Sequence, residues 1–532
     1  MENQKSGTAS DRIKPVLAFG LSGLSGLLFF SAFPPFNQGE LAFIALIPFL
    51  FSLRLYSSAS CRLGYFAGLV CWIPSLWFLS PVTIPGAMLL AAYCALYWVP
   101  VAWVWGRFMK TWTAGRPLLS LRMVIGGAGW WCAMEHVRGW FLTGFPWNDL
   151  GVSQWENYSL MQIASLGGVM MLSFLLVALN LGIALSIMGL FESMGKRQAR
   201  RMHPELYLPI LLLVTSFSWG SREFRRLVRV PERSLRVGVV QPLASNKWSE
   251  ELALKNFRVL WELSDAALSL NPDLLLWPET AVPEMLRDSR TTQSLVQSLV
   301  KDGTPLLLGS MDFETRSDGE QVEVLYYNSV FMVDGTGTTV GEYRKKHLVM
   351  FGEYLPFGKF LPFLRSLTPM PEDVTPGESS GVLPMPGSDL NLGMLICFED
   401  LMPGLSADLV KEGSDLFVNQ TNDAWFDPLW GSTGHLAHAV FRSVEQRRPM
   451  VRATNSGVSA WIDTRGMVRD VIEDPKLKKR DIRGFKIFDV QIPSGPETTV
   501  YYQYPWAFPA FCWVTSLFIL PLNKRLKIGK RR

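Results

Sequence analysis

Histidine and cysteine are scarce in this sequence, and its excess of charge is small. The 532 residues include five His and six Cys, and the net charge is +5. Between residues 221 and 503 there is one Cys, Cys397, together with His347, His435 and His438. That Cys has no disulfide partner in the segment, and no Cys pair joins the His residues as a zinc site would need. We therefore predict no metal site, and the small net charge does not indicate nucleic-acid binding.

Lysine and arginine are missing from three short loops, at 34–38, 80–83 and 141–159. The loops separate apolar segments in a chain that is 48% hydrophobic, contains 20 Trp and has a mean hydropathy of +0.17. A helical span needs about 20 apolar residues to cross a bilayer. Candidate spans lie at about 15–33, 39–53, 63–79, 84–106, 123–140, 160–189, 205–220 and 504–522. The sequence therefore predicts a polytopic α-helical membrane domain of about eight transmembrane helices, about seven within 1–220 and one at 504–522.

Basic residues gather on the other side of these spans. They cluster at 5–14, 54–62, 107–122, 196–201 and in the tail 523–532. Because Lys and Arg favour the cytoplasmic side, this alternation predicts that both termini are cytoplasmic and that 221–503 lies outside. The first span is longer than the apolar core of a signal peptide and has no clear small-residue cleavage site, so we expect it to be retained.

The outer segment turns to alternating strands and helices after a charged linker at 221–235. Apolar runs predict strands at 236–241, 273–277, 305–309, 391–396, 415–419 and 450–454. Helical spacing predicts helices near 249–270, 290–301, 403–412 and 432–447, and hairpins are expected at 327–344 and 459–471. Strands that alternate with helices indicate an α/β domain, which we place at 236–492.

The strand Asn391-Leu-Gly-Met-Leu-Ile396 delivers Cys397 to its end, directly before Glu399 and Asp400. Taken alone, this thiol is either a nucleophile or a small buried hydrophobe. It is the one thiol of an exported segment, and it stands beside two carboxylates. This setting favours chemistry over packing.

Two other polar residues follow apolar strands. Glu279 ends Asp273-Leu-Leu-Leu-Trp-Pro-Glu279, and Lys345 follows the expected hairpin. A carboxylate takes the proton of a thiol, a thiolate attacks a carbonyl, and an ammonium group stabilises the resulting oxyanion. Glu279, Lys345 and Cys397 therefore form a complete set for acyl transfer.

The short sequence motifs around these residues, and their order along the chain, resemble those of the nitrilase or carbon–nitrogen hydrolase superfamily. They are Leu276-Trp-Pro-Glu279, Tyr343-Arg-Lys-Lys-His-Leu348 and Cys397-Phe-Glu399. The resemblance implies that Glu279 is the general base, Lys345 the oxyanion stabiliser and Cys397 the nucleophile. It also implies a nitrilase-like domain folded as a four-layer αββα sandwich.

A motif in the predicted membrane domain narrows the resemblance from the superfamily to one family within it. Thr143-Gly-Phe-Pro-Trp147, followed by Ser153-Gln154, is similar to the membrane part of bacterial apolipoprotein N-acyltransferases, which soluble nitrilases lack. The chain departs from the usual pattern at Phe398, where many members carry Tyr, so no role can rest on a phenolic hydroxyl there. It also departs at Met350, where Pro is usual.

That family implies further site residues on the matching positions of this chain. Glu353 is expected to hold Lys345, and Glu399 is expected to support the site. Trp248 and Trp425 match functional positions, where each contacts an acyl chain or lid or, alternatively, is a core aromatic. The long loop 355–389 is either a lid on the membrane surface or collapsed onto its own domain.

The resemblance implies a reaction in the bacterial inner membrane with the catalytic domain in the periplasm. A phospholipid, with phosphatidylethanolamine as the expected one, gives an acyl chain to Cys397, and the thioester passes it to the N-terminal S-diacylglyceryl-cysteine of a lipoprotein. This ping-pong route requires no cofactor. The alternatives are a membrane-anchored amidase, in which water takes the second step, and a non-catalytic binding protein that retains the fold.

Glu135 and Arg138 stand at i and i+3 near the outer end of a predicted span. Two interpretations are open from the sequence. The pair touches a lipid headgroup, or the two side chains satisfy one another and reach to the interface.

Overall fold

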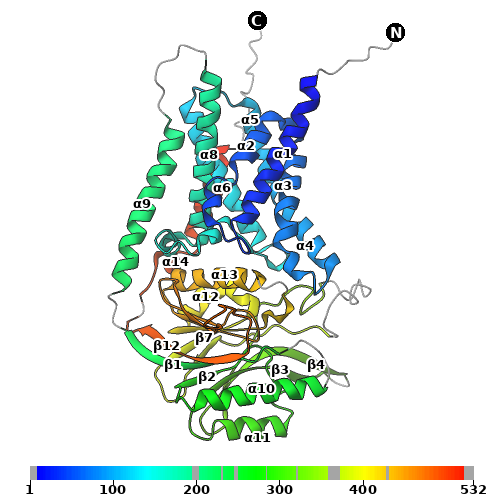
Figure 1. The fold of residues 1–532 in the computed structure, drawn as a ribbon, viewed down its shortest axis with the longest axis vertical. Coiled ribbons are helices and arrows are strands. Elements are labelled where there is room, and N and C mark those ends of the chain that lie inside the picture. Colours follow the sequence, from blue (N-terminus) through cyan, green and yellow to red (C-terminus); the bar gives the residue numbers. More distant parts are fainter. Residues whose placement is uncertain are drawn as a thin grey trace.

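The computed structural model describes residues 9–194, 203–228, 232–244, 250–282, 284–318, 321–356, 372–426, 430–495 and 497–519. A bundle of helices forms one end of the molecule and an α/β domain the other (Figure 1). The bundle contains α1 Ala9–Ser31, α2 Ile47–Leu55, α3 Ser60–Ser75, α4 Ile84–Leu96, α5 Trp98–Thr111, α6 Pro117–Arg138, α7 Ala164–Gly167, α8 Val169–Ser193, α9 Pro204–Leu227, α14 Val500–Gln503 and α15 Ala507–Ser516.

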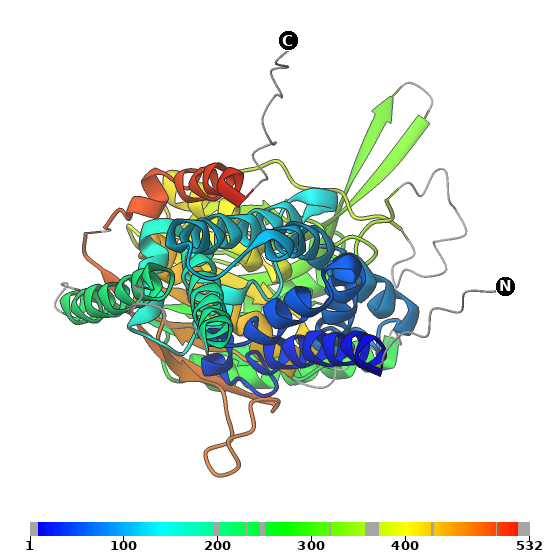
Figure 2. The ribbon, with the colours of Figure 1, turned by 90° about the horizontal axis from the view of Figure 1, so that it is seen from above.

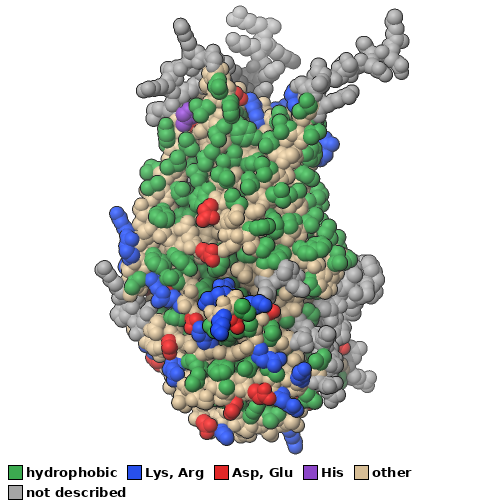
Figure 3. All heavy atoms as spheres, viewed as in Figure 1, with side chains coloured by type: hydrophobic (Ala, Val, Ile, Leu, Met, Phe, Trp, Pro, Cys, Tyr) green, Lys and Arg blue, Asp and Glu red, His purple; other side chains and the backbone are tan. Residues whose placement is uncertain are grey.

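The helical bundle has the apolar surface that a membrane requires. On the face drawn in Figure 3, hydrophobic side chains cover most of the bundle, whereas most Lys, Arg, Asp and Glu side chains lie on the α/β domain. Within the described residues, three helices are long and apolar enough to cross a membrane, at Ile13–Ser31, Ile84–Thr111 and Val169–Ser193. Gly39–Leu55 and Ser57–Ser75 make a fourth if this pair, bent by 106°, is one span. The structure thus supports three or four spans, and the count of eight remains a prediction.

Two predicted boundaries differ from the structure. The span expected at 39–53 is broken into a 3-10 helix, Gly39–Phe43, and the nine-residue α2, which at 1.5 Å per residue reaches about halfway across a bilayer. The linker expected at 221–235 is mostly helix and strand, because α9 continues to Leu227 and β1 begins at Glu232. The C-terminal span predicted at 504–522 begins with α15 and continues to Ile519 as a short apolar helix.

Two six-stranded sheets form the centre of the α/β domain. Their order is β12-β1-β2-β3-β4-β5 and β11-β10-β9-β8-β7-β6. The strands are β1 Glu232–Gln241, β2 Leu274–Leu276, β3 Leu306–Asp318, β4 Gln321–Val333, β5 Thr339–Arg344, β6 Val382–Pro384, β7 Asn391–Ile396, β8 Leu416–Thr421, β9 Met450–Thr454, β10 Ala460–Ile462, β11 Val468–Val471 and β12 Gly484–Pro493. Every strand predicted from an apolar run is present. β12 was not predicted. β3 and β4 pair along their whole length as a long hairpin, which projects from the rest of the α/β domain (Figure 2).

Helices cover the outer face of each sheet. α10 Glu250–Leu268 and α11 Arg290–Leu299 pack on the first sheet, and α12 Pro403–Lys411 and α13 Trp430–Gln446 lie on the second, between it and the bundle (Figure 1). One buried cluster joins the two sheets, with Val237 and Leu276 from the first and Met394 and Val418 from the second. This is the four-layer αββα arrangement expected from the sequence.

The core of the bundle continues into the α/β domain. Buried residues of α13 share one apolar cluster with the bundle helices, so no solvent layer separates the two parts. β7, β8 and β9 run parallel, and their carboxyl ends therefore meet at one edge of the second sheet. The chain segments that follow these three strands supply Cys397 and Glu399, after β7, and the turns at Asn422 and Asn455, after β8 and β9.

Candidate active site

Cys397 begins a short 3-10 helix, Cys397–Leu401, directly after β7. Its backbone has φ 51°, in the left-handed region that non-glycine residues rarely adopt. The side chain is half-buried. Burial raises the pKa of the Cys397 thiol, the negative charge of Glu279 raises it further, and Lys345 opposes both effects. The resting thiol therefore keeps its proton and needs a base at the moment of attack.

Glu279 lies just beyond β2 of the other sheet and is 8% exposed. One carboxylate oxygen accepts a hydrogen bond from Asn328 Nδ2 at 2.7 Å, and the other accepts from the backbone N–H of Asn422 at 2.9 Å. Gly309 of β3 permits this position, because a Cβ there would lie 2.8 Å from the Cα of Glu279. Burial raises the pKa of Glu279, and the charge of Glu353 adds to the effect. Glu279 is therefore a stronger base than an exposed glutamate.

Lys345 follows β5 and is 1% exposed. Its ammonium nitrogen lies 2.8 Å from Glu353 Oε1 and 3.7 Å from Glu279 Oε1. Burial alone would lower the pKa of Lys345, but the carboxylates of Glu353 and Glu279 and the nearby Cys397 raise it above the usual value. The amine is therefore a permanent cation beside the thiol. The predicted contact between Glu353 and Lys345 is present.

Glu399 ties the nucleophile to the segment that carries Lys345. Its buried carboxylate accepts hydrogen bonds from the backbone N–H groups of Lys346, at 2.8 Å, and His347, at 3.0 Å. It also accepts from the backbone N–H of Ile396, at 2.7 Å, and from the Tyr343 hydroxyl, at 2.9 Å. Burial raises the pKa of Glu399, whereas these donors lower it. The predicted supporting residue thus joins two chain segments and does not itself bond the thiol.

Several residues at the site were not predicted from the sequence. Asn328 bridges the two acidic residues, since its Nδ2 also lies 3.2 Å from Glu353 Oε1. Asn455 Nδ2 donates to Asn422 Oδ1 at 3.0 Å and so supports the turn that bonds Glu279. Asn is uncommon in strands, so Asn328 within an expected strand was the sequence feature that could have marked it as a site residue.

The two Trp residues singled out from the sequence remain without an assigned contact. Trp425 is half-buried in a short 3-10 helix, Asp423–Trp425, after β8. Trp248 lies outside the described residues, as does 357–371, the central part of the predicted lid. Their proposed roles toward an acyl chain stay predictions. Arg452 is fully buried and pairs with Asp400 beneath the site.

The loop after α6 reaches from the bundle to the candidate site. The ring of Phe145 stacks on Phe398 at 5.9 Å between centroids, and Phe398 in turn stacks on His347 at 6.1 Å. Trp147 packs against His438 of α13 at 5.3 Å. An aromatic side chain of the loop after α6 therefore reaches Phe398, which lies between Cys397 and the segment that carries Lys345.

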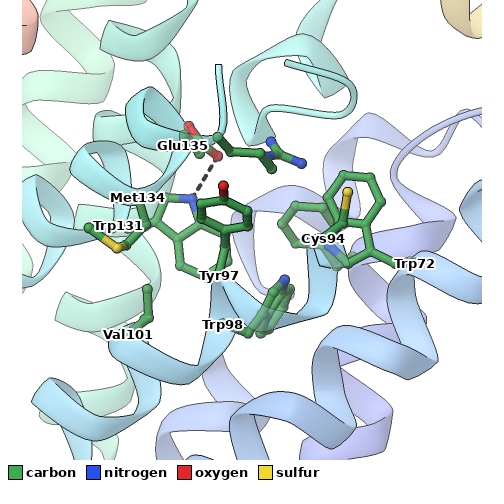
Figure 4. Close-up of a pocket in the computed structure, with 10 residues that line it drawn as sticks. Trp72, Cys94, Tyr97, Trp98, Val101, Trp131, Met134 and Glu135 are labelled. Atoms are coloured by element: carbon green, nitrogen blue, oxygen red, sulfur yellow. Dashed lines mark hydrogen bonds between the residues drawn. The ribbon is translucent and has the colours of Figure 1, made fainter. Parts of the chain in front are cut away.

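Glu135 and Arg138 hold this loop in place, which neither sequence interpretation had foreseen. Arg138 donates to the backbone carbonyl of Trp147 at 2.8 Å and to Asp149 at 2.6 Å. Glu135 accepts from Trp131 Nε1 at 2.7 Å, drawn in Figure 4, and from the backbone N–H of Leu150 at 2.9 Å. Both side chains border a cavity of about 20 Å³ between aromatic rings, room for one water rather than an acyl chain.

A metal ion has no evident place in the part of the chain that the structure describes. No group of three or more His, Cys, Asp or Glu side chains is arranged there to hold one. The arrangement instead supports covalent chemistry by a thiol, a buried base and a buried cation.

Comparisons with known proteins agree with this description. Residues 25–182 match the model of the apolipoprotein N-acyltransferase N-terminal domain, and residues 236–474 match carbon-nitrogen hydrolase. An apolipoprotein N-acyltransferase of Geobacter metallireducens is 32% identical over 526 residues, covering 95% of each chain. This chain belongs to the apolipoprotein N-acyltransferase family. A relative of that name from Caulobacter vibrioides is 30% identical, covering 98% of this chain and 96% of its own.

Another family member, apolipoprotein N-acyltransferase 1 of Treponema denticola, is 28% identical and covers 91% of this chain. Among solved structures, an amidase from Nesterenkonia sp. is 18% identical and covers 52% of this chain and 95% of its own, with a TM-score of 0.35. The two matched domains correspond to the two parts of the fold: the first to the helical bundle and the second to the α/β sandwich. The acyltransferase family thus accounts for nearly the whole chain.

Proposed function

We propose that this chain transfers an acyl chain from a phospholipid to the N-terminal S-diacylglyceryl-cysteine of lipoproteins. The observation that carries the proposal is the buried group of Glu279, Lys345 and Cys397, assembled from two sheets, with Phe145 of the loop after α6 stacked on Phe398, the residue that follows Cys397. The names of the relatives supply the acceptor. Phosphatidylethanolamine is the expected donor.

The first half-reaction acylates the enzyme. Glu279 takes the proton of the Cys397 thiol as the sulfur attacks the ester carbonyl, and Lys345 stabilises the negative charge that forms on the carbonyl oxygen. The C–O bond then breaks, and the departing lysophospholipid oxygen takes the proton from Glu279. A thioester remains on Cys397.

The second half-reaction transfers the acyl chain. The α-amine of the lipoprotein cysteine attacks the thioester, and Glu279 accepts the proton that the nitrogen loses. The C–S bond breaks, the proton returns to the thiolate, and an amide leaves the site. The raised pKa of Glu279 suits both steps, because the same carboxylate must take up a proton and then return it.

The helical bundle is explained by the substrates. Donor and acceptor are both confined to a bilayer, so a site anchored there meets them at a high effective concentration. We place the protein in the bacterial inner membrane, with the catalytic domain on the periplasmic side and both termini in the cytoplasm. Phe145 and Phe398 offer an apolar surface at the thiol, as an acyl chain would require.

The test is intact-protein mass after incubating the detergent-solubilised protein with phosphatidylethanolamine, followed by a diacylglyceryl-cysteine peptide. We expect an acyl-sized, hydroxylamine-labile adduct on Cys397 that moves to the peptide amine, and no adduct in Cys397→Ala. An adduct lost to water equally fast without peptide would establish a membrane-anchored amidase instead. Failure of every lipid donor would refute the assignment of the three residues, and full activity in Cys397→Ala would favour a non-catalytic binding protein.

A further inference from the structure

A buried histidine on α13 lies beneath the nucleophile. His435 is 1% exposed, and each of its ring nitrogens faces a carboxylate. Nδ1 lies 3.0 Å from Asp423 Oδ1, and Nε2 lies 2.8 Å from Asp400 Oδ1. Both carboxylates are at most 1% exposed. The two acidic residues come from turns after β8 and after β7, so His435 joins the turns that flank the site.

The same histidine also reaches the backbone of Cys397. Nε2 lies 3.3 Å from the Cys397 carbonyl oxygen, which also accepts a hydrogen bond from Asn419 Nδ2 at 3.1 Å. Cys397 has a φ of 51°, and a non-glycine residue in this region costs about 1 kcal/mol or more. Such a conformation persists only where neighbouring groups hold it. The two donors to the carbonyl are among the contacts at this turn, together with the bond from the Ile396 N–H to Glu399.

The charges around His435 favour its protonated form. Burial alone would lower the pKa of His435, but Asp400 and Asp423 raise it to about 9, against an opposing effect of Arg452. Both ring nitrogens then carry hydrogen at neutral pH. Nδ1–H points to Asp423, and Nε2–H is shared between Asp400 and the Cys397 carbonyl. Arg452, which pairs with Asp400, balances the second carboxylate.

The surroundings shield this cluster from water. Trp147, from the membrane loop, lies 6.4 Å from the His435 ring, and Phe426 lies 6.5 Å from it on another side. The next titratable groups along α13 are His438 and Arg442. Burial and the charge of Arg442 lower the pKa of His438, so its ring is neutral and does not compete for the carboxylates.

We propose that His435 is a positioning residue for Cys397, and that its Nε2–H holds the nucleophile's carbonyl and thereby keeps the reactive turn formed. The role rests on the proposed acyl-transfer function, because it acts through Cys397 and touches no substrate. It requires a hydrogen-bond donor at this place rather than a particular ring. A neutral side chain with a correctly placed N–H therefore satisfies it, provided that its other polar atom also finds a partner.

Three variants separate this role from a packing role. His435→Gln turns an amide oxygen toward the Asp423 carboxylate, and the repulsion displaces the donor. His435→Gln combined with Asp423→Asn removes that repulsion and restores the donor. His438→Gln is the matched control, since His438 is buried on the same helix and accepts from the backbone N–H of Asn148, a bond that the Gln amide oxygen can keep, so the loop stays held and the Cys397 turn is untouched.

The measurement is the rate of acyl-enzyme formation across donor concentrations and pH, with thermal unfolding recorded for each variant. We expect His435→Gln to lower the maximal rate at least tenfold at an unchanged half-saturating donor concentration. The double variant should recover to within about fivefold of the original protein, and His438→Gln should stay within threefold. The original protein should lose rate as the pH rises through about 9, because the neutral ring keeps one N–H for the three acceptors that face it, and the double variant should lack this loss.

Two results would overturn the proposal: an unchanged rate in His435→Gln, or a folded double variant as slow as the single one. Alkylation of Cys397 by iodoacetamide provides a readout that needs no lipid. If the original protein forms no acyl-enzyme, the proposed function fails. The positioning role is then decided by whether His435→Gln changes the alkylation rate while the double variant restores it.

Discussion

Replacing Glu399 with Gln tests how the site is held together. The carboxylate accepts hydrogen bonds from the backbone N–H groups of Lys346, His347 and Ile396 and from the Tyr343 hydroxyl. The Gln amide has the same shape but keeps only one acceptor oxygen, and its NH2 group replaces the carboxylate oxygen that accepts from Ile396. The oxygen can keep its bonds to Lys346 and His347, but the N–H of Ile396 then faces another donor.

The cost follows from that one lost acceptor. A buried N–H without a partner costs about 1 to 3 kcal/mol. The remaining hydrogen bonds weaken because their acceptor is no longer charged. The neutral amide also avoids the desolvation cost of a buried charge, and these two effects offset one another. We expect Glu399→Gln to lower the free energy of unfolding by about 2 kcal/mol. In a domain of this size that corresponds to a fall of about 4 to 8 °C in Tm.

The assay is thermal unfolding in detergent, together with the rate of acyl-enzyme formation at a temperature where both proteins are folded. We expect the rate to fall about tenfold or more, because the N–H of Ile396, directly before Cys397, loses its acceptor and the turn that carries the thiol is held less firmly. Glu412→Gln is the control, since this exposed carboxylate also accepts from a hydroxyl and a backbone N–H, those of Ser380 and Gly381. It should change Tm by less than about 2 °C. A Glu399→Gln protein as stable and as active as the original would refute this account of Glu399.

Three further predictions follow from the charges and contacts of the site. Lys345→Met leaves two buried carboxylates without their cation, so we expect acyl-enzyme formation to fall at least about 100-fold and stability by about 3 to 5 kcal/mol; an active, stable variant would contradict the assignment. The acid limb of the acylation rate should lie above the range of an ordinary glutamate, because burial raises the pKa of Glu279 and the base is lost as the pH falls through that value. Asn328→Leu removes a hydrogen bond that lowers this pKa, so the limb should move to higher pH, and a move to lower pH would argue against Glu279 as the base. Arg138→Met frees the loop after α6 and should slow acylation about threefold to tenfold, whereas Arg107→Met, which removes an exposed guanidinium over the Trp103 ring, should not; equal effects of the two would show that the loop contact is irrelevant.

Local patterns were most informative where one chain segment decides its own structure. The apolar runs before Glu279 and Cys397 are strands because a short run of mostly apolar residues suits a strand buried on both faces. The helices at 250–268 and 430–446 follow from helical spacing of apolar residues. In contrast, β12 places Lys486, Asp489 and Gln491 among apolar residues without regular alternation and pairs with β1 across some 250 residues, so its sequence alone was ambiguous.

The membrane half shows the same division. Apolar length located the helices, but it did not reveal that α2 is too short to cross a bilayer or that α9 runs on into the predicted linker. Hydropathy averages over a window and does not register a bend of 106° between helices. Arg138 was visible as an unusual charge in an apolar helix, yet its partner Asp149 stands in the following loop and could be identified only from the packed structure.

The sequence by itself determined the class of fold and the candidate residues Glu279, Lys345 and Cys397 in their order along the chain. Each of these follows from the residues of a short stretch of chain. The tertiary structure decided what surrounds them. Only folding brings the end of β2 in one sheet to the end of β7 in the other, places Glu353 on Lys345 and sets His435 beneath the Cys397 carbonyl. Contacts between segments so far apart depend on packing and desolvation, which no local pattern records.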